Sequence, residues 1–456
     1  MPTPSLLIVP SRWKTGSPGK LYSQIPTNGN GDFNVTGVVT GGTSIGTRVN
    51  NIGYIEPITT SGTPRLDYYT SSGVPGCPAL LVEPSGTNLC LQSEDFLTTW
   101  TPTNVSATTG TTAAFTAPDG TTNADLITAT SNGPSFIGQN LTIASGTYTI
   151  SVFAKAGNYG LFRIGNVSSV ARAAWFNLDA GAVTGTVNGG TASMQNYGNG
   201  WYRCTYTSTG VVTGSPTVFF APSDAPNSTN AVSGSSIYFW GAQLETGSVA
   251  TSYIPTTAGT GSRSADVVSV SGAVSGSIGQ TEGTIYAEVD IRNVGLGEGS
   301  IVTLFQASNN YVEILRGTLN RIQASIADSA GSTNLTTTTG FITANSIYKI
   351  ALGYKSGEFA LYVNGTQVAT SSAARTIGGL TTVRLGSYST SFIFNDRIRA
   401  AALYTTRLTN ADLLLLTLPG NNTYLPQAVW DNYLSRPGNS EVPDCLYTRH
   451  ADLLDV

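Results

Sequence analysis

The feature that most constrains the fold is a recurring pattern of short alternating segments rich in Val, Ile, Thr, Tyr and Phe. Gly, Asn, Ser and Pro separate these segments, and helical periodicity is nearly absent. Alternation with a period of two places successive side chains on opposite faces of a strand. Many short strands divided by turn residues are typical of sandwiches and barrels. We therefore predict an all-β chain with two tandem antiparallel β-sandwiches (jelly rolls) after a small irregular β-containing N-terminal section.

Two segments show the alternation most clearly, residues 148–155 and residues 285–291. In the first, we expect Tyr148 to share a face with Ile150 and Val152, and Phe153 to lie on the other face. In the second, we expect four apolar side chains to point inward: Ile285, Ala287, Val289 and Ile291. Three side chains are expected to point outward into solvent: Tyr286, Glu288 and Asp290.

Turn and cap residues predict two local structures late in the chain. Asn364-Gly365 lies between two alternating runs and favours a two-residue type I′ hairpin, because both turn positions need a positive φ. Residues 411–416 are expected to form a short helix that Thr409 or Asn410 caps and that a Pro-Gly pair ends.

Composition shifts along the 456 residues divide the chain into folded sections and connections. We predict an N-terminal section at 1–92, a jelly-roll sandwich at 93–268, and a Ser/Gly/Val-rich linker at 269–280. A second sandwich is expected at 281–419. The tail at 420–456 carries several aromatic residues, so we expect it to pack against something.

The charge balance excludes some classes of function. Lys and Arg total 22 and Asp and Glu total 26, for a formal net charge of −4. A nucleic-acid-binding protein needs a concentrated basic face, so no nucleic-acid partner is expected. The one histidine, His450, is near the end of the sequence and is read as a solvated tail residue. Histidine-dependent triads and H-E-x-x-H zinc sites would have to use this one residue, so we do not expect them in this chain.

Cysteine spacing gives no metal or redox motif. The four cysteines are Cys77, Cys90, Cys204 and Cys445, and none forms C-x-x-C. Cys77 and Cys90 are close enough in sequence to bridge, although spacing does not show that they do. The favoured interpretation is isolated buried thiols in a reducing compartment.

Apolar runs are short at both ends of the sequence. Residues 6–9 are stopped by Pro10, and residues 413–416 are far too few to cross a bilayer. We therefore expect no signal peptide and no membrane insertion, and a soluble protein that is cytoplasmic as made.

Three sets of motifs carry resemblances to known proteins. The first comprises TRVN (47–50), GYIE (53–56), PRLDY (64–68), ALLVEP (79–84), TNL (87–89) and SEDF (93–96). The second comprises GWYRC (200–204), WGAQLE (240–245) and ATSYIPT (250–256). The third comprises LYVNG (361–365), VRLG (383–386), LY (403–404) and LTNADL (408–413).

The first set resembles the N-terminal region of tailed-bacteriophage tail, fibre and appendage proteins. The second resembles their jelly-roll module, which is similar to carbohydrate-binding modules, and the third resembles the laminin-G or concanavalin-like sandwich. The resemblance implies a non-enzymatic structural component of a phage virion, made in the host cytoplasm. Its N-terminal section would attach to other virion proteins, and its sandwiches would contact glycans or neighbouring subunits. Such appendages are commonly homotrimers.

Two other functions stay open: a glycan-binding adhesin for host recognition, and a glycan depolymerase of the tailspike type. The best catalytic pair is Glu288 with Asp290, but the third position of an E-x-D-x-x-E pattern is Asn293. Glu94 and Asp95 are adjacent and would point to opposite faces of a strand. The glycine-rich residues 295–299 are read as a loop. We therefore predict no enzyme activity, no catalytic residue and no cofactor, and leave a structural calcium open.

Charged and aromatic residues suggest contacts without selecting a ligand site. Arg65 with Asp67, or Arg48 with Glu56, would form either buried polar pairs or ordinary solvated ones. Stacking on sugars needs exposed aromatic faces, and six candidates are available: Trp175, Trp201, Tyr202, Trp240, Tyr311 and Tyr354. Trp201 and Trp240 lie within motif strands, so core packing is expected for both. The binding residues therefore remain unassigned.

Overall fold

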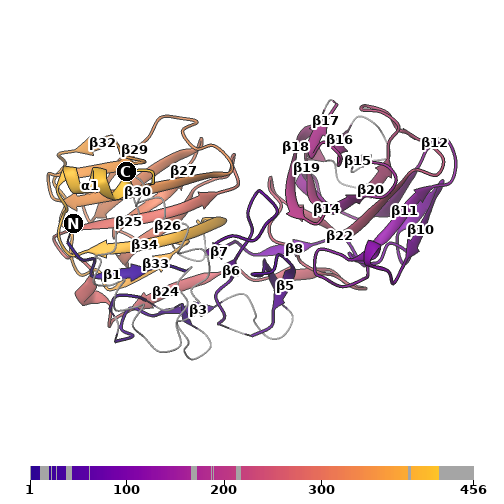
Figure 1. The fold of residues 1–456 in the computed structure, drawn as a ribbon. Helices are drawn as coiled ribbons and strands as arrows, with labels where there is room; N and C mark the ends of the chain where they lie inside the picture. The colour runs from indigo at the N-terminus through magenta and orange to yellow at the C-terminus, as the bar shows by residue number, and fades with distance from the viewer. Residues whose placement is uncertain are drawn as a thin grey trace, which may run out of the picture.

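The structure is a computed structural model of the 456-residue chain. It describes residues 2–10, 20–21, 23–26, 28–36, 44–60, 62–165, 172–185, 187, 189–211, 217–388 and 392–420. His450 and Cys445 lie outside the described residues, as does the predicted tail from residue 421 on. Two β-sandwiches lie side by side, and strands from the first part of the chain run between and beneath them (Figure 1). The predicted all-β class with antiparallel sandwiches is confirmed.

The jelly-roll sandwich consists of two sheets that each have six strands within the described residues. The first sheet has the order β10 (Val105–Thr109), β11 (Asp125–Ala129), β22 (Ser236–Thr246), β14 (Gly146–Ala156), β19 (Trp201–Val211) and β18 (Gly190–Gly198). The second has the order β17 (Ala182–Thr184), β16 (Ala173–Asn177), β15 (Leu161–Gly165), β20 (Thr217–Pro222), β13 (Phe136–Asn140) and β9 (Thr101–Thr103). Neighbouring strands pair antiparallel.

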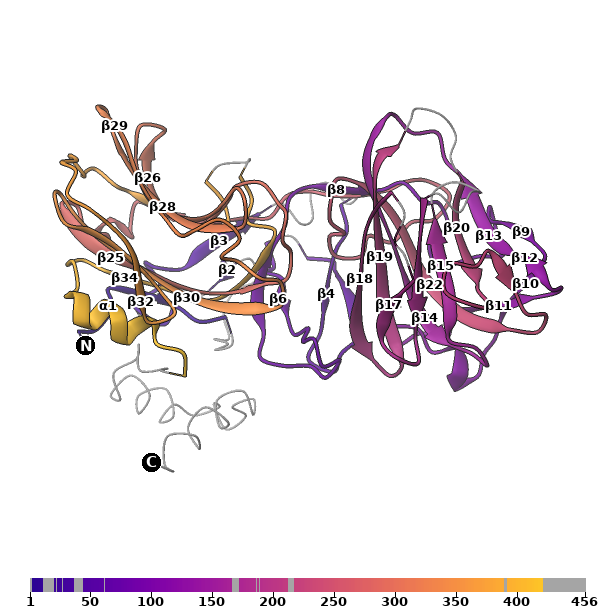
Figure 2. The same ribbon diagram turned by 90° about the horizontal axis from the view of Figure 1, so that it is seen from above.

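The other sandwich consists of two sheets with eight strands each among the described residues (Figure 2). The first has the order β32 (Thr366–Ser371), β31 (Phe359–Val363), β30 (Ser346–Lys355), β25 (Glu282–Ile291), β34 (Asp396–Tyr404), β7 (Ala79–Val82) and β6 (Leu66–Asp67), and β1 (Leu6–Ile8) also pairs with β34. The second has the order β2 (Lys20–Leu21), β3 (Phe33–Thr36), β24 (Val267–Ser271), β33 (Thr382–Leu385), β26 (Gly299–Ala307), β27 (Asn310–Gly317), β28 (Arg321–Asp328) and β29 (Gly331–Thr336).

Smaller elements complete the described chain. Three two-stranded pairs are β4 (Gly46–Val49) with β5 (Ile55–Ile58), β8 (Gly86–Asn88) with β23 (Gly261–Arg263), and β12 (Gly133–Pro134) with β21 (Asn230–Ala231). Short 3-10 helices occur at Ala113–Phe115 and Ser275–Ser277. The one α-helix in the described residues is α1 (Asn410–Thr417).

The predicted domain boundaries need correction, because the C-terminal sandwich is not made from 281–419 alone. Strands β1, β2, β3, β6 and β7, all inside the predicted N-terminal section, belong to its two sheets. Strand β24 also belongs to it, so residues 269–271 of the predicted linker are sheet rather than connection. The chain leaves this sandwich near Gly86 and returns near Arg263, where β8 and β23 pair antiparallel. The jelly roll is therefore an insertion within a discontinuous sandwich.

The local predictions from turn and cap residues are confirmed. Asn364 and Gly365 both have positive φ, at 47° and 77°, between β31 and β32. Thr409 caps α1, because its side chain accepts a hydrogen bond from the backbone N–H of Asp412. The hairpin and the helix were predictable because their signals lie within a few residues of each other.

Burial differs from the prediction on the outer face of β25. The inward side chains of β25 lie in the main core of the C-terminal sandwich. However, Tyr286, Glu288 and Asp290 are also buried, at 0%, 2% and 5% exposure. Tyr286 packs in a second cluster with side chains of α1, and arginines cover the two carboxylates. The sequence could not show the covers from α1 and Arg399, because they come from distant segments, whereas Arg292 is only two residues from Asp290.

The strand β14 also has two buried faces. Tyr148, Ile150 and Val152 lie in the jelly-roll core, as predicted, and Phe153 lies in a separate apolar cluster. This second cluster contains Val49 and Tyr69 from the first part of the chain. The N-terminal residues therefore contact both sandwiches, and they form the structural link between them.

Candidate functional site

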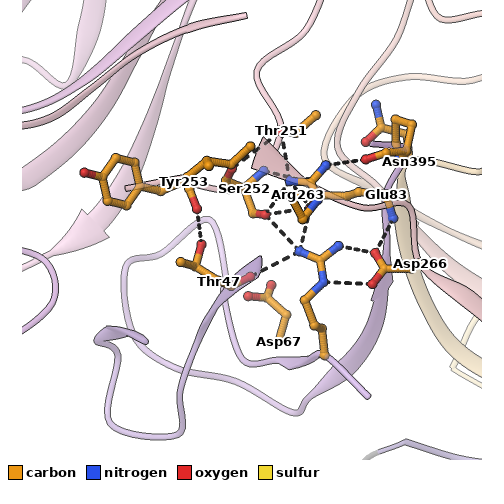
Figure 3. Close-up of polar contacts among 12 residues, drawn as sticks. Thr47, Asp67, Glu83, Thr251, Ser252, Tyr253, Arg263, Asp266 and Asn395 are labelled. Carbon is orange, nitrogen blue, oxygen red and sulfur yellow. Dashed lines mark hydrogen bonds and ion pairs between the residues drawn. The ribbon is translucent and has the colours of Figure 1, made fainter. Parts of the chain in front are cut away.

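The most elaborate polar site in the described chain lies where the two sandwiches meet. We call it the junction and define it by the charged residues Arg65, Glu83, Arg263 and Asp266 and by Ser252. Figure 3 labels Glu83, Arg263, Asp266 and Ser252. Arg65 precedes β6 and Glu83 follows β7. Arg263 ends β23, Asp266 precedes β24, and Ser252 lies in the segment after β22. The site thus brings together parts of the chain separated by up to 201 residues.

Backbone pairing places the two carboxylates next to each other. The N–H of Asp266 donates to the carbonyl of Glu83 at 3.0 Å, and the N–H of Glu83 donates to Asp266 Oδ2 at 2.8 Å. Two buried carboxylates side by side repel each other, so the arrangement requires nearby cations.

Arg65 supplies the first cation. Its Nη1 donates to Glu83 Oε2 at 2.6 Å, and its Nε and Nη2 donate to the two oxygens of Asp266, the Nε at 3.2 Å. Nη1 also donates to the carbonyl of Thr47 at 3.1 Å and to Ser252 Oγ at 2.8 Å. The guanidinium is fully buried, and the two-point contact with Asp266 fixes its plane.

Arg263 supplies the second cation, from the strand that ends the jelly-roll insertion. Its Nη1 lies 3.2 Å from Glu83 Oε2 and donates to the hydroxyls of Thr251 and Ser252, both at 3.0 Å. Ser252 in turn donates to Glu83 through its N–H and its hydroxyl, both at 2.7 Å. Two cations therefore balance two anions, and hydroxyl and backbone groups take up further hydrogen bonds, although Arg263 Nε has no partner among the described residues.

The electrostatics keep the junction ionised. Burial alone would raise the pKa of Glu83, but the guanidinium groups of Arg263 and Arg65 hold this pKa well below its usual value. Burial alone would lower the pKa of Arg65, whereas the carboxylates of Asp266 and Glu83 raise it above its usual value. A carboxylate held in this way does not carry a proton near neutral pH, so it is unsuited to act as a general acid.

A second set of ion pairs lies beside the junction. Arg397 on β34 donates to Asp67 at 2.6 Å, and Arg292 donates to Asp290 at 2.6 Å. Both guanidinium groups lie over the ring of Tyr69, 5.3 and 5.1 Å from its centroid. Asp67 also accepts the N–H of Val49 at 2.8 Å, which ties β4 to the same site.

The space within the junction is too small for a ligand. The cavity there has a volume of about 50 Å³ and is lined by side chains that include Asp67, Arg203 and Arg397. Small-molecule sites typically measure roughly 300–1,000 Å³, and a water molecule occupies about 30 Å³. The junction is therefore a structural connection between the sandwiches rather than a binding pocket.

The structure decides between the alternatives for the predicted charged pairs. Arg48 and Glu56 do pair, at 2.7 Å, with side chains 23% and 35% exposed. Arg65 and Asp67 do not pair with each other: Arg65 contacts Glu83 and Asp266, and Asp67 contacts Arg397. The sequence prediction named one residue of the junction, Arg65, but missed its partners.

Glu288 and Asp290 form ion pairs instead of an acid pair on an open face. Arg399 Nε donates to Glu288 at 2.8 Å, and Arg292 Nη2 donates to Asp290. Asn293 donates to the side chain of Asp396 and to the carbonyl of Asn395, both at 3.3 Å. Glu94 and Asp95 make separate contacts: Glu94 accepts from Tyr253 Oη at 3.0 Å, and Asp95 accepts from the N–H of Leu97 at 2.9 Å.

The six aromatic candidates for glycan contact fall into two groups. Four are buried, with at most 2% exposure: Trp175, Trp201, Trp240 and Tyr354. Trp201 and Trp240 pack in the apolar cluster between the N-terminal residues and β14, in agreement with the core role predicted for them. Tyr202 and Tyr311 are half-buried, and they keep part of their rings accessible.

The described cysteines are free thiols. Cys90 and Cys204 are buried, Cys77 is half-buried, and Cys77 and Cys90 form no bridge. No group of three or more His, Cys, Asp or Glu side chains in the described residues is arranged to hold a metal ion. No helix among the described residues is both long and apolar enough to span a membrane.

Comparison with protein families identifies one module. Residues 261–413 match the family model of the concanavalin A-like lectin/glucanases superfamily. These residues include the strands from β24 to β34, so this part of the C-terminal sandwich has the laminin-G or concanavalin-like fold that the motifs at 361–413 predicted. Among curated proteins, none matches this chain significantly.

Several solved structures are similar over about a third of the chain. The CBM40 of the Ruminococcus gnavus IT-sialidase is 14% identical, with 31% of this chain and 85% of that chain covered and a TM-score of 0.28. Domain 4 of AbnA, a GH43 extracellular arabinanase from Geobacillus stearothermophilus in complex with arabinotriose, is 13% identical, with 34% and 73% covered and a TM-score of 0.29. The binding domain of botulinum neurotoxin DC in complex with rat synaptotagmin II is 14% identical, with 36% and 40% covered and a TM-score of 0.28. Likeness at this level does not identify a ligand for this chain.

Proposed function

We propose that this protein is a non-catalytic structural component of a tailed-phage virion, in which two β-sandwiches are held at a fixed relative position. The observation that supports this most directly is the junction, where Arg65 joins Glu83, Asp266 and Ser252 from three other segments. An appendage that transmits contact from a particle to a surface needs stiff connections, and buried ion pairs that are linked by several hydrogen bonds resist bending and separation.

The motifs of the resemblance to virion proteins gather at this place. PRLDY contributes Arg65, ALLVEP contributes Glu83, and ATSYIPT contributes Ser252. Motifs that are far apart in the sequence thus share one structural role, which accounts for their occurrence in the same chain. This supports a common architecture with the appendage proteins that the motifs resemble.

The absence of catalysis is part of the proposal. A retaining or inverting glycosidase needs two carboxyl groups facing one sugar, one of them protonated. Glu288 and Asp290 each face an arginine instead, and both are at most 5% exposed. The pair that the sequence offered for this chemistry is therefore engaged in ion pairs with Arg399 on the adjacent strand β34 and with Arg292 directly after β25.

Partners follow from the same proposal. Other virion proteins would bind the surface formed by the first part of the chain, and copies of the chain would associate as a homotrimer. With 11% charged residues, two surfaces of this protein approach each other with little electrostatic cost. Size-exclusion chromatography with light scattering tests the trimer: it predicts three times the 47.4 kDa chain mass, and a monomer at micromolar concentration contradicts it.

A second candidate, a glycan-binding adhesin, is favoured by the match of residues 261–413 to a lectin-containing superfamily. The two candidates are compatible, since a virion appendage also meets the host surface. They differ in what must be observed: a structural component has to be present on the particle, whereas an adhesin has to bind a glycan.

The decisive experiment for the proposal is localisation. Antibodies raised against the purified chain are applied to gradient-purified particles of the phage that encodes it and are detected with gold in electron micrographs. We expect labelling at a fixed position on the particle. Absence of the chain from purified particles, checked by mass spectrometry, contradicts the virion role. Release of reducing ends from capsular or cell-wall polysaccharide contradicts the non-catalytic role.

A further inference from the structure

The outer face of one sheet in the C-terminal sandwich carries two adjacent rows of side chains with different character. Strand pairing aligns Arg384, Thr303, Glu313 and Ser325 across β33, β26, β27 and β28. Two residues further along, it aligns Phe305 with Tyr311 on the same face. The face therefore has a polar row beside an aromatic row. We use the name aromatic platform for these two rows together with the side chains of Tyr388 and Phe392.

The aromatic rings of the platform form one connected group. The ring of Tyr388 lies 5.0 Å from Tyr311, 5.6 Å from Phe305 and 6.3 Å from Phe392, in edge-to-face geometry. Mutual edge-to-face contacts stabilise the positions of aromatic rings. Tyr388 Oη also donates to the carbonyl of Ser308 at 3.2 Å, which fixes the ring in place. The group is preorganised before any ligand arrives.

These rings are accessible, unlike those of the jelly-roll core. Phe392 is 51% exposed, and Phe305, Tyr311 and Tyr388 are half-buried. Phe392 also has a positive φ of 56°, an unfavourable conformation for a residue with a large side chain. The hydrogen bond from the N–H of Ser300 to its carbonyl, at 2.9 Å, holds this backbone on the sheet. An exposed Phe kept in a costly conformation indicates a role outside the core.

The polar row places hydrogen-bonding groups beside the rings. The guanidinium of Arg384 lies 4.0 Å from the centroid of Phe305. The carboxyl of Glu313 is nearly buried, and Ser300 Oγ donates to its Oε2 at 2.9 Å. No salt bridge to Glu313 occurs within the described residues, and the hydrogen bonds that it accepts there from Ser300 and Thr303 both end on Oε2. Its Oε1 accepts no hydrogen bond from the described residues.

From this arrangement we infer that the aromatic platform is a carbohydrate-binding site for neutral pyranose-containing glycans. A pyranose has a C–H face that packs on aromatic rings and equatorial hydroxyls that point sideways. Here the rings of Tyr311 and Phe392 would pack on the C–H face of the sugar, and Arg384 and Glu313 would form hydrogen bonds with its hydroxyls. An acidic sugar fits less well above about pH 7, where Glu313 is ionised, because Glu313 faces the same surface as Arg384 and repels a second carboxylate.

This inference rests on the glycan-contact part of the proposed function, and it assigns that contact to one face of one sandwich. It is independent of whether the chain belongs to a virion. It also differs from the sequence prediction, which named Tyr311 among six candidates and selected no site. Phe305, Tyr388 and Phe392 were missed because they form a group only after β33 and β26 pair.

The test uses the full chain on an array of neutral oligosaccharides built from glucose, galactose, mannose and rhamnose, together with sialylated oligosaccharides. The strongest neutral hit is then titrated by calorimetry against wild type, Phe392→Ala, Tyr311→Ala and the control Leu319→Ala. Leu319 is 61% exposed and is not part of the platform. We expect Phe392→Ala and Tyr311→Ala each to weaken binding at least about 10-fold, and Leu319→Ala to bind like wild type.

The possible results test the location of the site separately from glycan binding by the protein. If wild type binds a neutral glycan and both platform variants retain its affinity while remaining folded by thermal melting, the site assignment is wrong and glycan binding stands. If wild type binds only sialylated probes, the ligand class is wrong. If it binds no probe, the inference and the adhesin candidate both fail, whereas localisation on particles is still tested separately by gold labelling.

Discussion

Arg65 and Asp266 are 201 residues apart in the sequence, and they form a two-point ion pair in which both side chains are almost fully buried. Arg65 precedes β6 and Asp266 precedes β24, so the pair ties the two large sheets of the C-terminal sandwich at the point where the jelly roll is inserted. Glu83 and Ser252 complete the contact.

Removing the charge of Arg65 should destabilise the protein strongly. Arg65→Met leaves Asp266 buried without a cation and Glu83 with Arg263 alone, which costs about 3–5 kcal/mol. Arg48→Met is the matched control, because the half-exposed pair with Glu56 contributes at most about 1 kcal/mol. Urea unfolding followed by tryptophan fluorescence measures both. Equal effects of the two changes would contradict a structural role for the junction.

The junction should make the protein sensitive to acid. The pKa of Glu83 is held below its ordinary value of 4.5 by Arg263 and Arg65, so the folded state binds this proton less readily than the unfolded state. The stabilisation is present in full above about pH 4.5 and is lost as the pH falls below it. Melting temperatures from pH 6 to pH 3 should fall less steeply for Glu83→Gln, which starts from a lower stability, than for wild type. Glu56→Gln should retain the steep wild-type decline.

Glu313 should produce a pH dependence of the opposite sign. Burial raises its pKa to about 7, although hydrogen bonds from Ser300 and Thr303 oppose this, and the nearby Glu298 adds to it. The folded state therefore holds the proton more tightly, and stability decreases as the pH rises from about 4.5 to 7. Glu313→Gln mimics the protonated form, so it should gain stability relative to wild type at pH 8 and little at pH 4. A gain of the same size at both pH values would contradict the raised pKa.

Thiol reactivity should distinguish the three described cysteines. Burial raises the pKa of Cys90 and of Cys204 above that of an ordinary thiol, so neither supplies thiolate in the folded state. Cys77 is half-buried and accessible. In a Cys445→Ser background, Ellman's reagent should label one thiol in buffer and three in denaturant. If the thiol that reacts in buffer disappears in Cys77→Ser, that thiol belongs to Cys77. Two thiols that react rapidly in the folded protein would contradict this assignment.

A close backbone approach between the N-terminal part and the jelly roll should be intolerant of a side chain. Gly198 on β18 has a φ of +80°, and a Cβ there would collide with the carbonyl oxygen of Gly73. Gly272 has a similar φ of +72° with open space around it. Gly272→Ala should cost about 1–2 kcal/mol from backbone strain alone, and Gly198→Ala should cost more. Urea unfolding measures the loss of stability in each variant. Equal losses would show that the backbone contact between Gly198 and Gly73 adjusts to a side chain at little cost.

The sequence predicted those features whose signals are local. The Asn364-Gly365 turn and the Thr409 cap depend on neighbours within a few residues, and both occur as predicted. Pairing partners were not predictable in this way. Arg65 and Asp67 are two residues apart, and spacing suggested that they pair, yet each finds a partner 18 to 330 residues away.

The same reason explains the error on β25. Alternation correctly identified the face that carries Ile285, but it could not show that α1 and Arg399 cover the other face. A strand with both faces buried has no solvent-facing side, and only the assembled fold reveals what lies over it. The aromatic platform was missed in part because it, too, is assembled from strands that pair at long range.

The insertion of the jelly roll has a consequence for synthesis on the ribosome. The strands β1, β3 and β7 emerge early, but their sheet partners come after the inserted jelly roll: β34 pairs with β1 and β7, and β24 pairs with β3. The inserted module can close as soon as its last strand leaves the exit tunnel, while the first part of the nascent chain still lacks its sheet neighbours. A message cut short before the codons for β34 would therefore yield a folded jelly roll that carries an unpaired, aggregation-prone leader.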